Sequence, residues 1–271
     1  MSGLHLRLRA APPGEIDAAA LGGQLQAMSP AEISRLPLPR LGSTQPLRVA
    51  DCFAVAPRAD QRVVVEGDLR QFHRLACRWA TGELVVEGDV GERFASQMRG
   101  GEVHVEGNAS AGAAEQMGGG ELRISGEVGD ELGRPLPGRR SGISGGRIIV
   151  AGRAGHRAGY RMRRGTIVIL GDCGDAAGCD LVAGTIVVAG ATGRDLGAGM
   201  RRGTIVVPNF NLLSPVRFSR PQREQLSIAR LLAHELLPAA PAIAAALQTD
   251  ITRAVGDLSA GGMGEIWLYR R

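Results

Sequence analysis

Lysine is absent from this chain of 271 residues, and aromatic residues are scarce. All 32 basic side chains are therefore arginine, and with 27 acidic side chains they leave a formal net charge of +5. Aromatic residues make up 3% of the chain, and the acidic residues are spread along it. Nucleic-acid-binding proteins usually combine a basic stripe with aromatic side chains that stack on bases. The composition therefore disfavours nucleic acid as a partner.

Long apolar runs and a disulfide framework are also missing. No run reaches the roughly 18 residues of a membrane-spanning helix, and the first residues, MSGLHLRLRA, lack the long apolar core of a secretory leader. The four cysteines, Cys52, Cys77, Cys173 and Cys179, fit free buried thiols in a reducing compartment better than paired cystines. We expect a cytoplasmic protein without membrane contact.

Glycine, in contrast, is abundant, and it recurs with a period of 19 residues. The chain has 40 glycines and 44% apolar residues, which suffice for a core. Eight similar pentapeptides, RVVVE, ELVVE, EVHVE, ELRIS, RIIVA, TIVIL, TIVVA and TIVVP, start at Arg62, Glu83, Glu102, Glu121, Arg147, Thr166, Thr185 and Thr204. The one long gap between them holds RPLPGRR, an insertion at 134–140. A fixed period of this length is typical of repeat architectures.

Each copy of the repeat has the alternation of a short β-strand. The second and fourth residues of every pentapeptide are apolar, so these sixteen side chains should point to one side and form the interior. Glycine occupies position six and position nineteen of all seven complete copies, where we expect it to permit positive φ at the corners beside the strand. Met98, Met117, Met162 and Met200, three residues before the closing glycine, are expected to fill those corners.

A 19-residue unit cannot bury its own apolar face, whereas stacked copies share a core. We therefore predict a mainly β fold at 62–208, a single-stranded right-handed parallel β-helix of about seven to eight coils. An N-terminal cap and linker at 1–61 should contain a strand through Leu4, Leu6 and Leu8 and a short helix from Ser29-Pro30 to about Leu36. A C-terminal segment at 209–271 should contain helices over 221–237 and 241–255 and a possible strand at 265–269.

Several motifs suggest catalysis, but each has a simpler structural explanation. The glycines of VVAGATGRDLG at 187–197 are spaced as in two other copies, which indicates repeat turns instead of a nucleotide loop. Cys173 and Cys179 are too far apart for a C-x-x-C zinc site. The five histidines are scattered, without a Ser/His/Asp or Cys/His arrangement. We therefore assign no catalytic residue and no metal ligand.

The outward strand positions change character along the chain. In the early copies they are acidic, at Glu83, Glu102 and Glu121 and at Glu66, Glu87 and Glu106, so something basic should cover that face. In the later copies the outward residues Ile149, Val168, Val187 and Val206 form an apolar ladder. Such a ladder is either covered by the chain's own helices or is an interface with another subunit, and the sequence leaves both alternatives open.

The glycine spacing G-x-x-G-x-x-x-G, found at Gly152, Gly171 and Gly190, and the corner motif M-R-x-G, found at Met98, Met162 and Met200, carry a family resemblance. The repeat resembles the C subunit of formylmethanofuran dehydrogenase and, more closely, the C subunit of the bacterial formyltransferase/hydrolase complex. It is also similar to the carboxy-terminal domain of glutamate synthase large subunits.

The resemblance implies a non-catalytic member of a one-carbon complex. That complex converts formyl-tetrahydromethanopterin, through a formylated methanofuran-type carrier, to formate during formaldehyde oxidation in methylotrophs. It implies amidohydrolase-like, molybdopterin-enzyme-like and formyltransferase subunits as partners, and no cofactor bound by this chain alone. The alternatives are the corresponding C subunit of a molybdenum or tungsten formylmethanofuran dehydrogenase, and a glutamate-synthase-like β-helix domain.

Arginines of the late copies should gather on one corner, because Arg163 and Arg201 share position seventeen and Arg164 and Arg202 share position eighteen. The carrier of the resembled family has a glutamate-rich tail, and the planar arginine side chain suits carboxylates. These four residues are therefore candidates for binding that anionic tail. A solvated basic rim and salt bridges to partner subunits are the alternatives.

Overall fold

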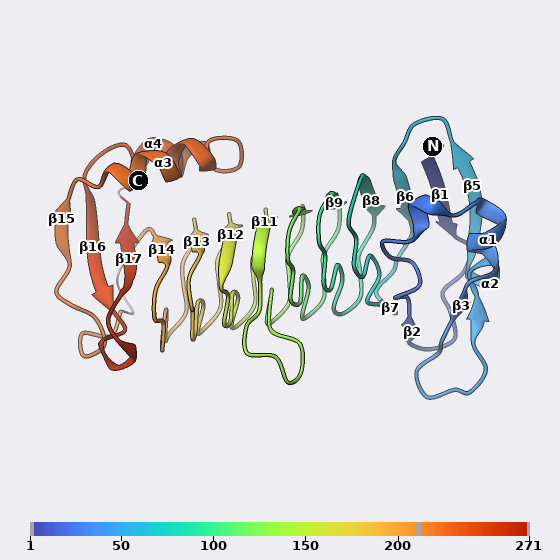
Figure 1. Ribbon diagram of the computed structural model, residues 1–271, viewed down its shortest axis with the longest axis horizontal. Coiled ribbons are helices and arrows are strands. Elements are labelled where there is room, and N and C mark those ends of the chain that lie inside the picture. The colour runs from blue at the N-terminus through green and yellow to red at the C-terminus, as the bar shows by residue number, and fades with distance from the viewer. Residues whose placement is uncertain (1–2, 210–212, 270–271) are drawn as a thin grey trace.

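The computed structural model describes residues 3–209 and 213–269. Its strands form one mixed sheet of 13, in the order β15-β16-β17-β14-β13-β12-β11-β10-β9-β8-β6-β1-β5, and two small sheets, β2-β7 and β3-β4. The few helices lie toward the two ends of the elongated molecule (Figure 1). The fold is therefore mainly β, as predicted.

Each copy of the repeat contributes one strand to the large sheet and pairs in parallel with its neighbours. The strands are β6 (Val63–Glu66), β8 (Glu83–Glu87), β9 (Glu102–Val105), β10 (Glu121–Ile124), β11 (Ser144–Val150), β12 (Arg164–Ile169), β13 (Thr185–Val188) and β14 (Thr204–Val207). The register follows the sequence repeat, so that Glu121 lies opposite Glu102 and Thr185 opposite Thr166. A second parallel ladder of single bridges joins one residue of each copy, from Leu69 through Ala109 to Thr192.

The interior is formed by the residues that the alternation predicts. All sixteen apolar side chains at the second and fourth positions are buried, and none exposes more than 2% of its surface. The four corner methionines are buried as well. The predicted direction of the strand side chains is confirmed, because the pairing keeps position two on position two in every neighbouring copy.

Glycine is required at position six and at position nineteen for different physical reasons. All seven closing glycines, at position nineteen, have positive φ, from 66° at Gly82 to 105° at Gly184, as predicted. At position six the expectation of positive φ is wrong for the five later copies, since Gly67 and Gly88 are the ones with positive φ. At Gly152 a Cβ atom would lie 2.6 Å from the carbonyl oxygen of Gly126 in the preceding copy. Glycine is needed there because the stacked backbones approach too closely for a side chain.

The N-terminal segment closes one end of the core. Strand β1 (Gly3–Leu8) pairs in parallel with β6 and antiparallel with β5 (Phe53–Arg58). Helix α1 (Pro30–Arg35) starts at the predicted capping box, in which the Ser29 side chain accepts from the Glu32 amide and the Glu32 carboxylate accepts from the Ser29 amide. The segment also contains β2 (Ile16–Asp17), the 3-10 helix η1 (Leu25–Ala27), β3 (Pro37–Leu38), β4 (Leu47–Arg48) and α2 (Val49–Cys52). Strand β2 pairs in parallel with β7 (Phe72–His73) of the first repeat copy.

The C-terminal segment is shorter in helix and richer in strand than predicted. Its elements are β15 (Gln222–Glu224), α3 (Ser227–Leu236), α4 (Pro241–Ala246), β16 (Ile251–Gly256) and β17 (Gly264–Leu268). The helix predicted over 221–237 is wrong before Ser227, because Gln222–Glu224 pairs as β15 with β16. The helix predicted over 241–255 is wrong beyond Ala246, because β16 pairs antiparallel with β17. The predicted final strand is confirmed, and it extends the repeat sheet by pairing in parallel with β14. The predicted domain boundary after Pro208 precedes residues 210–212, which lie outside the described residues.

Candidate functional site

The apolar ladder of the later copies is covered by the chain itself. Ile149 is 7% exposed, and Val168, Val187 and Val206 are fully buried. Helices α3 and α4 supply the covering residues Ala229, Leu232, Ala233, Leu236, Ile243 and Ala244, Leu247 follows at the end of α4, and β17 adds Trp267. The orange helices lie along this part of the repeat region in Figure 1. Of the two alternatives, the structure selects coverage by the chain's own helices, so this ladder offers no surface to another subunit while they are in place.

Two of the four predicted carrier-binding arginines line one groove. Arg163 and Arg201 lie on an open groove of about 1060 Å³, whereas Arg164 and Arg202 are exposed but do not line it. The backbone places the pair, since the Arg163 amide donates to the carbonyl of Ile143 and the Arg201 amide donates to the carbonyl of Leu181. The two arginines are two copies apart, which corresponds to about 10 Å at the usual strand spacing of about 4.8 Å.

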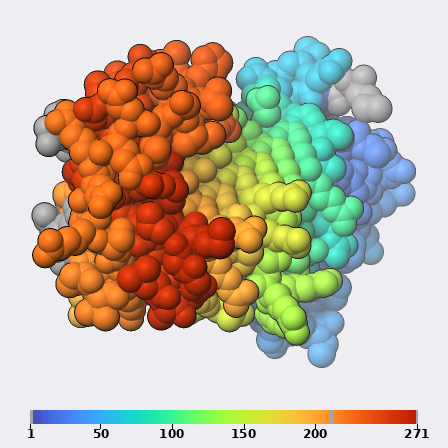
Figure 2. Space-filling view, turned by 60° about the vertical axis from the view of Figure 1, so that its left-hand side comes forward, coloured from blue at the N-terminus to red at the C-terminus, as the bar shows by residue number. Residues whose placement is uncertain are grey.

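Two segments outside the periodic positions of the repeat also line the groove. The insertion at 134–140 contributes Arg140 to the lining, and the short 3-10 helix η2 (Leu258–Ala260) contributes Ser259 and Ala260. Figure 2 shows the red C-terminal segment standing forward of the repeat copies. The sequence predicts a loop at the insertion, but no periodic signal indicates the direction in which a loop outside the repeat extends.

The groove carries an excess of positive charge. Four arginines line it, Arg140, Arg161, Arg163 and Arg201, and Asp180 is its one carboxylate. Arg161 pairs with Asp180 at 3.3 Å, from Nε to Oδ2. Within residues 3–209 and 213–269, Arg140, Arg163 and Arg201 have no carboxylate within 4.0 Å. Three guanidinium groups are therefore free to bind an anion.

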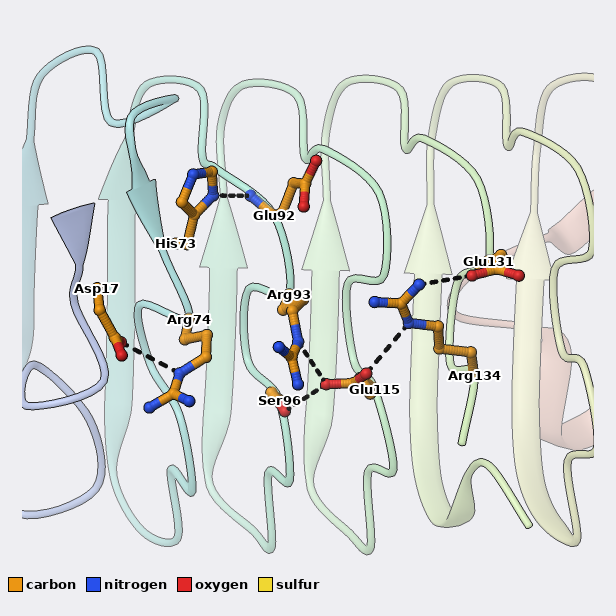
Figure 3. Close-up of polar contacts among 9 residues, drawn as sticks. All are labelled: Asp17, His73, Arg74, Glu92, Arg93, Ser96, Glu115, Glu131 and Arg134. Carbon is orange, nitrogen blue, oxygen red and sulfur yellow. Dashed lines mark hydrogen bonds and ion pairs between the residues drawn. The ribbon is translucent and has the colours of Figure 1, made fainter. Parts of the chain in front are cut away.

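A buried ion cluster fixes the start of the insertion (Figure 3). The fully buried Glu115 accepts from Arg93 Nε at 2.8 Å, from Arg134 Nε at 3.1 Å and from Ser96 Oγ at 3.2 Å. Arg134 also donates to Glu131 at 2.6 Å. Removing the buried Glu115 carboxylate would take from Arg93 its partner and would leave Arg134 with Glu131 alone. The cluster therefore orders the copy from which the insertion leaves.

The cysteines and histidines form no disulfide and no metal-binding group among the described residues. Burial raises the pKa of Cys173 to about 12, and Cys179 is partly exposed, unlike the other three thiols. All four cysteines are free, as predicted, although Cys179 is not buried. The ring of His73 accepts from the Glu92 amide at 3.1 Å, and that of His156 accepts from the Asp175 amide at 3.0 Å. In the described part of the chain, no group of three His, Cys, Asp or Glu residues could hold a metal ion, and no helix is long and apolar enough to cross a membrane.

The fold and the groove define a glycine-rich parallel-β repeat protein with a basic groove near its C-terminal end. No model of a known protein family matches the chain, and no curated protein matches it. A solved structure does match. It is a chain of the formyltransferase/hydrolase complex (FhcABCD) from Methylorubrum extorquens, crystallised in complex with methylofuran. The identity is 33%, the TM-score is 0.90, and the match covers 98% of this chain and 100% of that chain.

At 98% coverage of this chain, the match extends beyond the repeat into the N-terminal and C-terminal segments. The chain therefore belongs to the family formed by the C subunits of formylmethanofuran dehydrogenases and formyltransferase/hydrolase complexes, and it is similar to a chain of the latter.

Proposed function

We propose that this chain is a non-catalytic structural subunit of a cytoplasmic formyltransferase/hydrolase complex. In this assignment, amidohydrolase-like, molybdopterin-enzyme-like and formyltransferase subunits convert formyl-tetrahydromethanopterin, through a methanofuran-type carrier, to formate. The observation that carries the proposal is the similarity to a chain of that complex over 98% of this chain. That similarity includes the segments on both sides of the repeat.

We also propose that the stacked copies form a single right-handed parallel β-helix of about seven to eight coils. The two parallel ladders, one of strands and one of single bridges, support this arrangement, since each copy contributes one rung to both. The shared interior explains why copies that cannot fold alone are stable together.

Within the complex, we assign the basic groove to the anionic tail of the carrier. Arg163 and Arg201 support this role, because both line the groove and neither has a carboxylate neighbour in the described ranges. Arg140 extends the same charge toward the insertion. Arginine binds carboxylates through paired N–H groups, so a chain of carboxylates could contact successive arginines along the groove.

Two experiments test these assignments. Co-expression of this chain with the other subunits should give one complex that releases formate from the formylated carrier, whereas this chain alone should show no such activity. Formyl transfer or hydrolysis by the isolated chain would contradict the non-catalytic role.

For the groove, the variant Arg163→Gln/Arg201→Gln should lower the amount of carrier retained by the assembled complex several-fold at low salt, with a smaller difference at high salt. The matched control is Arg164→Gln/Arg202→Gln, which removes the same charge from neighbouring positions outside the groove lining. Equal retention by the two variants would refute the groove as the tail site.

A further inference from the structure

The outward face of the early copies differs from that of the later copies. In the later copies this face is apolar, and α3 and α4 cover it. In the early copies, β6, β8, β9 and β10, positions one and five on the same side of the sheet form what we call the acidic face, which consists of Glu66, Glu83, Glu87, Glu102, Glu106 and Glu121. Position three on that side, which holds the apolar ladder in the later copies, is occupied here by Val64, Val85, His104 and Arg123. Figure 1 shows the turn between α3 and α4 ending near β11, and Figure 2 shows a hollow between this turn and the cyan residues near the start of β6.

The carboxylates of the acidic face are held in register. Glu102 lies between Glu83 and Glu121 on the adjacent strands, and Glu66 lies opposite Glu87. Residues paired in this way on parallel strands are about 4.8 Å apart, so like charges repel unless cations stand between them. The fold thus concentrates negative charge on this side of the sheet, where Glu87, Glu102 and Glu106 are exposed.

The chain supplies cations for half of this charge. Glu66 pairs with Arg7, Glu83 lies 3.9 Å from Arg62, and Glu121 pairs with Arg123 and Arg147. Glu87, Glu102 and Glu106 are exposed and, among residues 3–209 and 213–269, have no cation within 4.0 Å. The expectation that something basic covers this face is thus met by the chain at its borders, while its centre remains available.

We propose that the acidic face is a docking surface for a basic amphipathic helix of another protein in the complex, which continues the helical layer that α3 and α4 begin. This inference rests on the proposed function, since the complex provides the partner. Charge complementarity selects a basic partner. A helix rises about 5.4 Å per turn, close to the strand spacing of about 4.8 Å, so basic side chains one turn apart follow Glu87 and Glu106 from strand to strand.

The existing helical hairpin shows how such a helix would be seated. Glu235 of α3 lies 3.7 Å from Arg147 of β11, so the hairpin already spans from the apolar ladder to the border of the acidic face. Leu237, at the turn of the hairpin, is 54% exposed. An incoming helix would contact this apolar side chain with one end and the carboxylates with its basic face.

Carboxyl footprinting of the free chain and of the assembled complex tests the proposal. Glycine ethyl ester with carbodiimide labels accessible carboxylates, and mass spectrometry locates the label. We expect Glu87, Glu102 and Glu106 to be labelled in the free chain and protected severalfold in the complex, while the exposed Glu92 and Glu127 are labelled equally in both states.

A pair of variants gives the second measurement. Glu87→Gln/Glu106→Gln should release this chain from the complex at a lower salt concentration than Glu92→Gln/Glu127→Gln, which removes the same charge elsewhere. Assembly with unprotected acidic-face glutamates, or equal salt sensitivity of the two variants, would overturn the docking surface and leave the proposed function intact. Failure of the unsubstituted chain to assemble would overturn both.

Discussion

A methyl group added at Gly165 tests the idea that close backbone stacking limits this repeat. Gly165 closes the fifth copy with φ +97°, and a Cβ atom there would lie 2.6 Å from the carbonyl oxygen of Gly146 in the preceding copy. Gly138, in the insertion, has a similar φ of +79° and no heavy atom within 4 Å of the added Cβ. The two alanine variants therefore share the strain of positive φ, and one of them adds a steric conflict.

The expected magnitudes follow from these two contributions. Positive φ costs an alanine on the order of 1 kcal/mol, partly offset by the reduced flexibility of the unfolded chain. Overpacking against a backbone atom adds about 1–3 kcal/mol. We therefore expect Gly165→Ala to lower the free energy of unfolding by about 2–4 kcal/mol, and Gly138→Ala by about 1 kcal/mol or less.

Urea denaturation followed by circular dichroism measures the difference in free energy of unfolding between the two variants. Thermal melting ranks their stabilities independently. In a domain of this size, 1 kcal/mol corresponds to roughly 2–4 °C in the midpoint. Equal midpoints for Gly165→Ala and Gly138→Ala would show that φ alone, and not contact between copies, requires glycine. That result would refute the close-stacking argument.

Three further predictions concern the core, the ion cluster and the thiols. Leu232, at a covering position on α3, is 8% exposed, and Leu232→Ala should lower the free energy of unfolding by about 2–4 kcal/mol. Its neighbour Leu231 is 68% exposed, and Leu231→Ala should change that free energy by less than about 0.5 kcal/mol. Equal effects of the two variants in denaturant titrations would mean that α3 does not pack on the ladder. Glu115→Gln should cost about 3 kcal/mol because Arg93 and Arg134 lose their shared carboxylate, and Glu127→Gln is the exposed control; a stability as high as that of the control would contradict the role of the cluster. Ellman's reagent at pH 8 should react first with the partly exposed Cys179 and should not detect Cys173 until the protein unfolds, because burial raises the Cys173 pKa to about 12 and keeps the thiol protonated; rapid native reaction at Cys173 would disprove this.

The sequence by itself determined the features that repeat. Alternation within a strand depends on local geometry, so the inward direction of Val63, Ile148 and Val207 could be predicted without a structure. The positive φ of the closing glycines could be predicted equally well, because the same corner recurs in every copy. The capping box at Ser29 and Glu32 is also local, and it begins α1 as predicted.

Only the tertiary structure decided which segments meet. The groove joins Arg140 of the insertion to Ser259 of the C-terminal segment, residues more than one hundred positions apart whose approach has no periodic signal. The strand β16 forms because β17 offers it a pairing edge, which overrides the helical pattern of 241–255. Coverage of the apolar ladder by α3 and α4 likewise depends on where the chain returns after β14. Local patterns specify a repeat because every copy has the same neighbours, whereas this groove is lined by unlike segments whose contacts arise only when the whole chain is folded.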